Sequence, residues 1–452
     1  MKENRPRRIS LNPLRQVFPG WWVVTACAAI GAYGGGVYFY GFTLFFNPLK
    51  DELQITSAQT SIVFSLTRLE GAFEGAAVGY LIDRYGARIV MKVGVLMAGI
   101  GFLLWATVVD SYWMFIVVYV GVIALGINGG FFHPALAVAN NWFIRRRAMA
   151  MSILGVAVGI GGAIIVPLLA YIINTQGWRT AAFLSGIGLL LFIFPLTFFI
   201  RHSPESMGLL PDGATAKSSN GAPLRSDTQQ SGDGHQEQRG TDYMMLEEVN
   251  FTVGQAFRTS SMWVFLAAIT LRFTAHTAIM VHLAPLMEDQ GMSTVAAGGA
   301  VGLLVFLSIP GRLVVGWLGD RYAKRKLMSG CLLIQTISLI VLYTATSVWQ
   351  LYFFIALWAA SYGAGILNWA IVGDYFGRAR FATLRGLMGL VYSWGAIVGP
   401  VYAGWVHDTT GAYSSAILVF AIITGAAMIL YWFCYPPRGA PGSTSPWESS
   451  EI

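Results

Sequence analysis

Apolar runs of about twenty residues or more alternate with short polar segments over most of the chain. A helix needs about 20 predominantly apolar residues to cross the hydrocarbon core of a bilayer. A window of that length finds two groups of six runs. The first group lies at about 20–46, 59–82, 89–109, 113–140, 147–173 and 179–200, and the second at about 261–287, 295–319, 327–346, 350–373, 384–406 and 413–435. The pattern predicts an all-α membrane protein with twelve transmembrane helices in two six-helix halves.

A polar segment separates the two groups of runs. Residues 202–249 are rich in Ser, Gly and Gln and hold almost nothing apolar, so we expect a flexible linker. A small folded domain is the alternative, but about 45 residues of this composition cannot supply a hydrophobic core. The expected divisions are an N-terminal tail at 1–19, a first half at 20–200, a linker at 201–258, a second half at 259–435 and a C-terminal tail at 436–452.

The composition fits a chain surrounded by lipid. Hydrophobic residues make up 55% of the 452 residues and charged residues 11%, whereas a soluble domain is typically about 25% charged. The formal net charge of +7 raises nucleic acid as a partner, but the distribution of the charges argues against it. With the N-terminus in the cytoplasm, 24 of the 29 lysines and arginines fall on the cytoplasmic side and only Lys50 and Arg179 on the other.

This asymmetry follows the positive-inside rule. It predicts a multi-pass protein of the plasma membrane, which is the inner membrane in a cell that has two, with both termini cytoplasmic. The remaining three basic residues, Arg68, Arg272 and Arg312, fall inside apolar runs. The three cysteines are spread over separate apolar runs without metal-type spacing, so we expect no metal site and no other cofactor.

The two halves share one short motif. Gly79–Arg88 reads GYLIDRYGAR after the second run, and Gly316–Lys326 reads GWLGDRYAKRK after the eighth, so an internal repeat is visible. The form G-x-L-x-D-R-x-G-x-R resembles the signature of the major facilitator superfamily. A positive-inside turn without further role is the alternative. The residues of the motif are Gly79, Asp83, Arg84, Gly86 and Arg88, with Asp320 and Arg321 in the second copy.

The resemblance implies two parallel six-helix repeats, of which one rocks against the other around a site near the bilayer midplane. It also implies that small glycines let the second and eleventh helices approach. Asp83 and the motif arginines would form a charge lock on the cytoplasmic face, which breaks and forms again during transport.

A narrower resemblance, to monocarboxylate transporters and oxalate:formate antiporters, covers most of the chain. It implies a transporter of a small organic anion that works by alternating access. The stretches that carry it are PGWWVV from Pro19, YGFTLFFNPLKDEL from Tyr40, NWFIRRRAMAMSI from Asn141, GWRTAAF from Gly177, RHSPESMGLLPDG from Arg201, GDYFGRARFATLRG from Gly373 and GPVYAGWVHDTTGAY from Gly399.

Ionisable residues inside apolar runs are functional candidates, because a charge buried in lipid is costly. Arg312 lies four residues before Gly316, where the similar monocarboxylate transporters have the arginine that binds the substrate carboxylate. A guanidinium suits this role because its planar fork pairs with both carboxylate oxygens and stays charged. An arginine that snorkels to the cytoplasmic surface is the alternative.

Two positions depart from the monocarboxylate transporter pattern. That family often has an aspartate four residues before the arginine, where this chain has Ser308, and its usual lysine of the first span is Tyr40 here. A tyrosine hydrogen-bonds a carboxylate but does not exchange a proton with it near neutral pH. A coupling proton therefore needs another carrier. The candidates are His276, His133, Glu70 and Glu74.

Arg272 and His276 stand four residues apart and share one helix face. They are candidates for a second anion contact and a titratable switch, since histidine changes charge near physiological pH. The alternative is an Arg272 that pairs with a carboxylate of the other half.

Arg68, Glu70 and Glu74 lie within the second run. Glu70 and Glu74 share one helix face, and Arg68 points largely away from them. We expect an interhelical ion network that changes partners between two states. Direct substrate contact and static packing are the alternatives.

The fourth run places Asn128 and His133 among small residues, and Pro134 is expected to break the helix and free backbone groups for a cavity. His133 is either a contact for substrate or proton or a packing residue with satisfied hydrogen bonds. The remaining cavity candidates are Tyr38, Tyr40, Tyr362, Asn368, Tyr392 and Trp394.

The sequence thus predicts a monomeric secondary transporter of a small carboxylate of the lactate or pyruvate kind, coupled to protons. An antiporter is an alternative, but no Lys or Arg lies between Gly386 and Val406, where the similar oxalate:formate antiporter uses a second cation for its dianion. Export of a larger amphipathic molecule and a membrane-embedded sensor are further alternatives. We expect no enzyme, since H-E-x-x-H, G-x-S-x-G and P-loop patterns are missing from the sequence.

Overall fold

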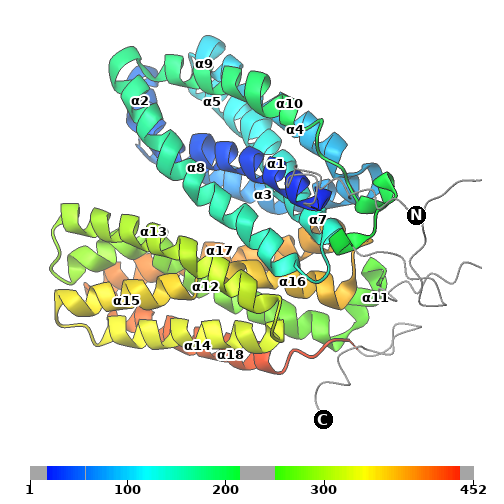
Figure 1. Cartoon of the computed structure of the whole chain (residues 1–452). Coiled ribbons are helices and arrows are strands. Elements are labelled where there is room, and N and C mark those ends of the chain that lie inside the picture. The colour runs from blue at the N-terminus through cyan, green and yellow to red at the C-terminus, as the bar shows by residue number, and fades with distance from the viewer. Residues whose placement is uncertain (1–17, 56, 214–249, 438–452) are drawn as a thin grey trace, which may run out of the picture.

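A computed structural model describes residues 18–55, 57–213 and 250–437. Every regular element in these ranges is a helix, and the helices gather in two bundles, one for each half of the chain (Figure 1). This confirms the all-α fold expected from the apolar runs. Most of the expected tails, and residues 214–249 of the expected linker, lie outside the described residues.

The first bundle makes six passes through the molecule. Its elements are α1 (Pro19–Gly34), η2 (Gly35–Tyr40), α2 (Phe42–Leu53), α3 (Ser57–Tyr85), α4 (Ala87–Val108), α5 (Tyr112–Val118), η3 (Tyr119–Ala124), α6 (Leu125–Ile127), η4 (Asn128–Phe132), α7 (His133–Trp142), α8 (Arg147–Gln176), α9 (Trp178–Gly188), η5 (Leu189–Ile193) and α10 (Phe194–Leu196). The elements η2 to η5 are π-helical turns, which often lie at functional sites. His133 opens α7 with helical torsion angles and Pro134 lies in its first turn, so the fourth pass continues through the proline instead of breaking there.

The second bundle repeats the six passes. Two short 3₁₀ helices and α11 precede it, and α15 and α16 together form one pass. The elements are η6 (Pro204–Met207), η7 (Pro211–Gly213), α11 (Val253–Arg258), α12 (Ser260–Asp289), α13 (Thr294–Gly319), α14 (Lys324–Tyr343), α15 (Val348–Ala360), α16 (Ala364–Phe376), α17 (Phe381–Thr410) and α18 (Ser414–Trp432).

Eleven helical stretches among the described residues are long and apolar enough to cross a membrane. The remaining pass is α3, whose 29 residues are ample at about 1.5 Å of rise per residue. Its charges, among them Glu70, Glu74 and Asp83, lower its hydropathy. The bundle is therefore a multi-pass membrane protein in which one pass carries unusual charge.

The same helix pairs form in both bundles. In the first, α1 packs along α8 and α4 along α9; in the second, α12 packs along α17 and α14 along α18. Between the bundles, α3 packs along α17 and α8 along α13. The internal repeat of the motif thus extends to the packing, and the expected approach of the second and eleventh passes is confirmed.

We call the end of the molecule that carries residues 201–213 and 250–258 the linker side. The two bundles lie against each other at this end and diverge toward the opposite end (Figure 1). Glycines permit the close approach, because a Cβ on Gly79 would clash with the carbonyl oxygen of Ala382. A Cβ on Gly386 would likewise clash with the carbonyl oxygen of Gly75.

The beginning of the expected linker differs from the flexible chain that its composition predicts. Nδ1 of His202 accepts a hydrogen bond of 3.1 Å from the backbone nitrogen of Ala87. Oδ2 of Asp212 accepts one of 2.7 Å from the backbone nitrogen of Arg145. Backbone N–H groups at helix starts lack partners within the helix, so polar side chains of residues 201–213 dock this segment on the first bundle.

Candidate functional site

Arg312 extends from α13 toward the first half. Its Nη1 donates a hydrogen bond to the carbonyl oxygen of Gly155 on α8, and its Cζ lies 4.7 Å from the ring centroid of Tyr362. It forms no ion pair with any described residue. A guanidinium stays charged at physiological pH and has five N–H donors. Arg312 therefore has donors left with which to bind an anion.

His276 on α12 lies beside the Arg312 and Tyr362 pair. Its ring stacks on Trp358 at 5.8 Å with an interplanar angle of 5°, and meets the ring of Tyr362 at 5.1 Å. Nδ1 of His276 is buried without a hydrogen-bond partner in the described part of the protein. The ring therefore has an unused polar atom within a mostly aromatic wall.

Arg272 lies one turn before His276 on α12 and is 2% exposed. Its Nε has no hydrogen-bond partner among the described residues, and no described carboxylate pairs with it. Arg272 and Arg312 both lie within electrostatic reach of His276. The expected pairing of Arg272 and His276 on one face is present, and the alternative partner for Arg272, a carboxylate of the other half, does not occur among the described side chains.

Tyr40 is a residue of the first half that lies near Tyr362, the neighbour of Arg312. Its ring packs on Gly162 of α8, where an added Cβ would lie 2.5 Å from Cδ2 of the ring. It also interacts electrostatically with Tyr362 of the second half. Ser308, which stands where similar transporters have an aspartate, is buried and donates a hydrogen bond of 2.7 Å to the carbonyl oxygen of Val305 in its own helix. Ser308 is thus a packing residue here.

Arg385 is a functional candidate that the sequence reasoning missed, because it was counted among the cytoplasmic basic residues. It lies inside α17 and is 8% exposed. Its Nη1 donates a hydrogen bond of 2.6 Å to Nδ1 of His133 in the first half, and its Cζ lies 4.5 Å from the ring centroid of Trp369. Its position within the eleventh apolar run was the signal that could have identified it.

Tyr392 joins the surroundings of Arg272 to those of Arg385. Its ring lies 4.7 Å from that of Phe273, next to Arg272, and 5.7 Å from that of Trp369, which stacks on Arg385. Trp394, further along α17, is 62% exposed. Tyr392 therefore lies between the residues that surround Arg272 and those that surround Arg385.

Glu70 and Glu74 form a separate polar group on α3. The two carboxyl groups lie within electrostatic reach of each other, and Nδ2 of Asn128 donates a hydrogen bond of 3.3 Å to Oε2 of Glu70. Oε1 of Glu70 and Oε2 of Glu74 are buried without partners among the described residues. Tyr38 lies within electrostatic reach of both carboxyl groups and completes the group. The side chain of Arg68 lies outside the described residues, so its expected direction is not described.

Asn368 is linked to the surroundings of Arg272 through Tyr431, which lies within electrostatic reach of Arg272. It is fully buried, and its Oδ1 accepts a hydrogen bond of 2.5 Å from the hydroxyl of Tyr431 on α18. Both residues belong to the second half. Asn368 thus ties α16 to α18 inside one bundle, and its Nδ2 is buried without a hydrogen-bond partner among the described residues.

The first copy of the motif acts as a helix cap between the halves. Oδ2 of Asp83 accepts hydrogen bonds from the backbone nitrogen and the hydroxyl of Thr383, at 2.8 and 2.6 Å. Its Oδ1 accepts one of 3.3 Å from the backbone nitrogen of Ala382. Arg84 and Arg88 form no ion pair with Asp83 in the described structure; they donate to the hydroxyl of Tyr80 at 2.6 Å and the carbonyl of Phe198 at 3.0 Å.

This geometry differs from the expected charge lock. The N-cap residue of α17 makes no side-chain cap, so its first N–H groups need an acceptor from elsewhere. Asp83 of the other half supplies it. Gly86, with φ of 87°, allows the sharp turn that follows α3.

The second copy repeats the same contact. Oδ1 and Oδ2 of Asp320 accept hydrogen bonds of 2.9 and 3.1 Å from the backbone nitrogens of Ala148 and Met149 at the start of α8. Arg321 stacks on Trp317, with Cζ 3.7 Å from the ring centroid. Each half therefore ends one helix with an aspartate that caps a helix of the other half.

Ion pairs reinforce the contact on the linker side. Asp374, at the end of α16, pairs with Arg147 of the first half at 2.6 Å and with Lys324 at 2.7 Å. Arg378 pairs with Glu205 at 3.0 Å and donates to the carbonyl of Asn141 at 2.7 Å. These contacts join the halves where Figure 1 shows them close together.

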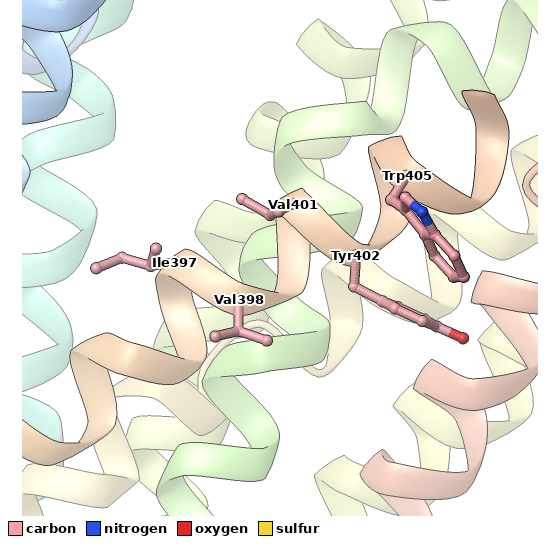
Figure 2. A pocket seen from close by; sticks show the side chains of 5 residues that line it. All are labelled: Ile397, Val398, Val401, Tyr402 and Trp405. Carbon is pink, nitrogen blue, oxygen red and sulfur yellow. The ribbon is translucent and has the colours of Figure 1, made fainter. Parts of the chain in front are cut away.

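A hollow of about 350 Å³ lies along the C-terminal half of α17. Its lining is almost wholly apolar, and Figure 2 shows the five side chains spread along one helix. None of the predicted site residues lines it, so it lies apart from the buried arginines. The lining residues are Ile397, Val398, Val401, Tyr402 and Trp405.

Comparison with known sequences agrees with this geometry. Residues 21–322 and 306–451 match the family model of the Major Facilitator Superfamily. Monocarboxylate transporter 2 of Rattus norvegicus is 24% identical, over 92% of this chain and 83% of that protein. The oxalate:formate antiporter of Oxalobacter formigenes is 22% identical, over 93% of both chains.

Solved structures share the fold. The fucose:proton symporter FucP of E. coli aligns with a TM-score of 0.67 at 14% identity, over 92% of this chain and 100% of that one. The human organic anion transporter MFSD10 aligns with a TM-score of 0.65 at 16% identity, again over 92% and 100%. The family match agrees with the two six-helix bundles and with the capping motif that both bundles share. The chain belongs to the Major Facilitator Superfamily of transporters, and within it is similar to monocarboxylate transporters and to an oxalate:formate antiporter.

Proposed function

We propose that this transporter moves a small organic anion, a monocarboxylate of the lactate or pyruvate kind, with Arg312 as the carboxylate anchor. One observation carries the proposal. Arg272, Arg312 and Arg385 are guanidinium groups in the membrane-spanning bundle, and none has a carboxylate partner among the described residues. A charge in the membrane needs a counter-charge. A carboxylate substrate would supply it.

Arg312 is the best placed of the three to bind the substrate. It reaches from the second half to Gly155 of the first half, beside Tyr40 and Tyr362. A carboxylate bound there would accept from the remaining guanidinium donors and the two hydroxyls. Because both halves would contribute contacts, occupancy would change how readily they move apart, as alternating access requires.

Glu70 and Glu74 are the best candidates for carrying a coupling proton. Glu70 and Glu74 lie within electrostatic reach of each other, and two buried carboxylates so placed repel each other when both are ionised, which favours a proton on one of them. His276 suits this role less, since a proton there would place a third positive charge near Arg272 and Arg312. We therefore propose a neutral His276 that hydrogen-bonds the substrate. Proton uptake or release would take place at Glu70 and Glu74, which we call the acid pair.

The linker side would face the cytoplasm. The charge asymmetry of the loops supports this orientation in the plasma membrane, the inner membrane in a two-membrane cell. In the conformation described here, the halves are joined on that side.

Exchange of a dianion is a second candidate function. Arg272 and Arg312 both lie within electrostatic reach of His276, so two carboxylates on one small molecule could pair with two guanidinium groups. The absence of a basic residue between Gly386 and Val406 favoured a monoanion, but Arg272 and the buried Arg385 supply further positive charge.

Uptake of radiolabelled lactate, pyruvate, formate and oxalate into proteoliposomes, with and without a pH gradient, tests the proposal. We expect an inward proton gradient to accelerate monocarboxylate uptake. Oxalate uptake that needs internal formate and ignores the gradient would favour exchange. Binding of none of these acids by the purified protein would overturn the anion assignment.

A further inference from the structure

A cavity of about 480 Å³ on the linker side is separate from the buried arginines and the acid pair. It lies between the starts of α1 and α8 in the first half and the end of α13 in the second. Three arginines and two tryptophans dominate its wall. The lining residues are Trp21, Arg145, Arg146, Met149, Trp317, Asp320 and Arg321.

The arginines of this cavity are exposed and available. The side chains of Arg145, Arg146 and Arg321 make no hydrogen bond or ion pair with another described residue, and Arg321 stacks on Trp317. Asp320 does not neutralise them by direct contact, because both of its oxygens accept from backbone nitrogens of α8. The cavity therefore presents three guanidinium groups and one engaged carboxylate.

The position of the cavity favours a membrane ligand. Trp21 begins the first pass and Trp317 ends the eighth, where tryptophans mark the membrane interface. Basic pockets between transmembrane helices at this level bind anionic lipid head groups. A volume of about 480 Å³ falls within the range of small-molecule sites, about 300 to 1,000 Å³.

We propose that this cavity binds a phosphate group, supplied by the phosphodiester of an anionic phospholipid in the adjoining leaflet. Arg146 from the first half and Arg321 from the second hold the phosphate oxygens, and the tryptophans line the glycerol and upper acyl region. Guanidinium forks match phosphate geometry.

The lipid also favours one conformation of the transporter. The cavity wall is divided between the halves, so separation of α8 from α13 takes the arginines apart. A ligand that binds the joined state more tightly shifts the population toward it. An anionic lipid at this site therefore holds the linker side closed. This consequence rests on alternating access, whereas lipid binding itself does not rest on the proposed substrate.

Nanodiscs of phosphatidylcholine, with or without phosphatidylglycerol, test the proposal. Lipids retained by the released protein are measured by native mass spectrometry. We expect retention of phosphatidylglycerol by the wild type, reduced about thirtyfold in Arg146→Gln/Arg321→Gln. Arg258→Gln/Lys326→Gln removes two charges from the same side outside the cavity and keeps retention. Arg146→Lys/Arg321→Lys keeps the charge and loses the guanidinium fork, so its retention should fall between that of the wild type and that of Arg146→Gln/Arg321→Gln.

Two results overturn the proposal. Equal phosphatidylglycerol retention by the wild type and by Arg146→Gln/Arg321→Gln removes the cavity as the site. Inorganic phosphate that quenches tryptophan fluorescence in detergent, without phosphatidylglycerol retention in nanodiscs, identifies a soluble phosphate and excludes the lipid. A spin-label distance between Ser206→Cys and Ala379→Cys that shortens with phosphatidylglycerol supports closure. An unchanged distance overturns the conformational part.

Discussion

Nη1 of Arg385 donates a hydrogen bond of 2.6 Å to Nδ1 of His133 and so joins α17 of the second half to α7 of the first. A guanidinium has no acceptor, so Nδ1 of His133 must accept. The bond exists only while that nitrogen carries no proton. The contact lies beside Gly75 of α3, where an added Cβ would lie 3.1 Å from Cε1 of His133.

We expect Arg385→Gln to loosen this contact between the halves. A hydrogen bond to a charged group contributes roughly 1.5 to 3 kcal/mol, so the joined conformation should become about ten- to a hundredfold less favoured. Spin-label distances between Ser206→Cys and Ala379→Cys, on the two sides of the linker-side contact, measure the shift. Arg258→Gln serves as control. An unchanged distance distribution would show that the contact does not hold the halves together.

Arg312→Lys should lower carboxylate affinity by roughly a hundredfold, because an ammonium cannot pair with both carboxylate oxygens. It also loses the stacking on Tyr362. Equilibrium binding of labelled lactate measures the change, with Arg258→Lys as a variant of the same chemistry outside the bundle centre. Wild-type affinity in Arg312→Lys would remove Arg312 as the anchor.

The acid pair makes a prediction about coupling. Glu70→Gln/Glu74→Gln should abolish uptake driven by a pH gradient while exchange of labelled for unlabelled substrate continues, because exchange needs no net proton movement. A pH-sensitive dye inside the vesicles reports the protons. Proton entry at the wild-type rate with substrate would show that another group carries the proton, with His133 and His276 next in line.

Gly79→Ala and Asp83→Asn test the cap between α3 and α17. The alanine methyl group would clash with the carbonyl oxygen of Ala382, so the helices must separate. The amide that replaces the carboxylate of Asp83 would keep one acceptor oxygen and lose the other. Loss of a cap costs about 1 kcal/mol, so we expect a several-fold shift away from the joined state. Cysteine labelling from the linker side measures it, and unaltered labelling in both variants would contradict the assignment.

His202 predicts a pH dependence of stability. Burial lowers the pKa of His202 below its usual value, and the charge of Glu205 acts in the opposite direction. The folded state therefore binds fewer protons at this site than the unfolded state. The contribution of neutral His202 to the free energy of unfolding is present above the ordinary pKa of about 6.5. It is lost as the pH falls through the lowered pKa of the folded state.

Protonation would also remove the acceptor for the backbone nitrogen of Ala87. We expect the thermal stability of the wild type to fall as the pH drops from about 7 to about 5, and His202→Gln to lack this part of the pH dependence. Scanning calorimetry of detergent-purified protein gives both curves. Parallel curves for the two proteins would contradict the role of His202.

The pattern of apolar runs determined the membrane-spanning, all-α fold and the two halves, because lipid allows only spans that satisfy their own backbone hydrogen bonds. The repeated motif around Asp83 and Asp320 indicated the family, because its glycines and charged residues lie close together in the sequence at the end of a helix. Arg312 and Arg272 also stood out, since a charge inside an apolar run is rare.

Other features depend on which helix lies opposite, and only the tertiary structure decided them. Asp83 caps a helix that begins almost three hundred residues later, and Asn368 of α16 accepts a hydrogen bond from Tyr431 of α18. Arg385 lies near the beginning of its span. The sequence shows that it falls within an apolar run, but not that it packs against His133 and Trp369, which buries it. Spacing along one helix predicts which residues share a face, but not what that face meets.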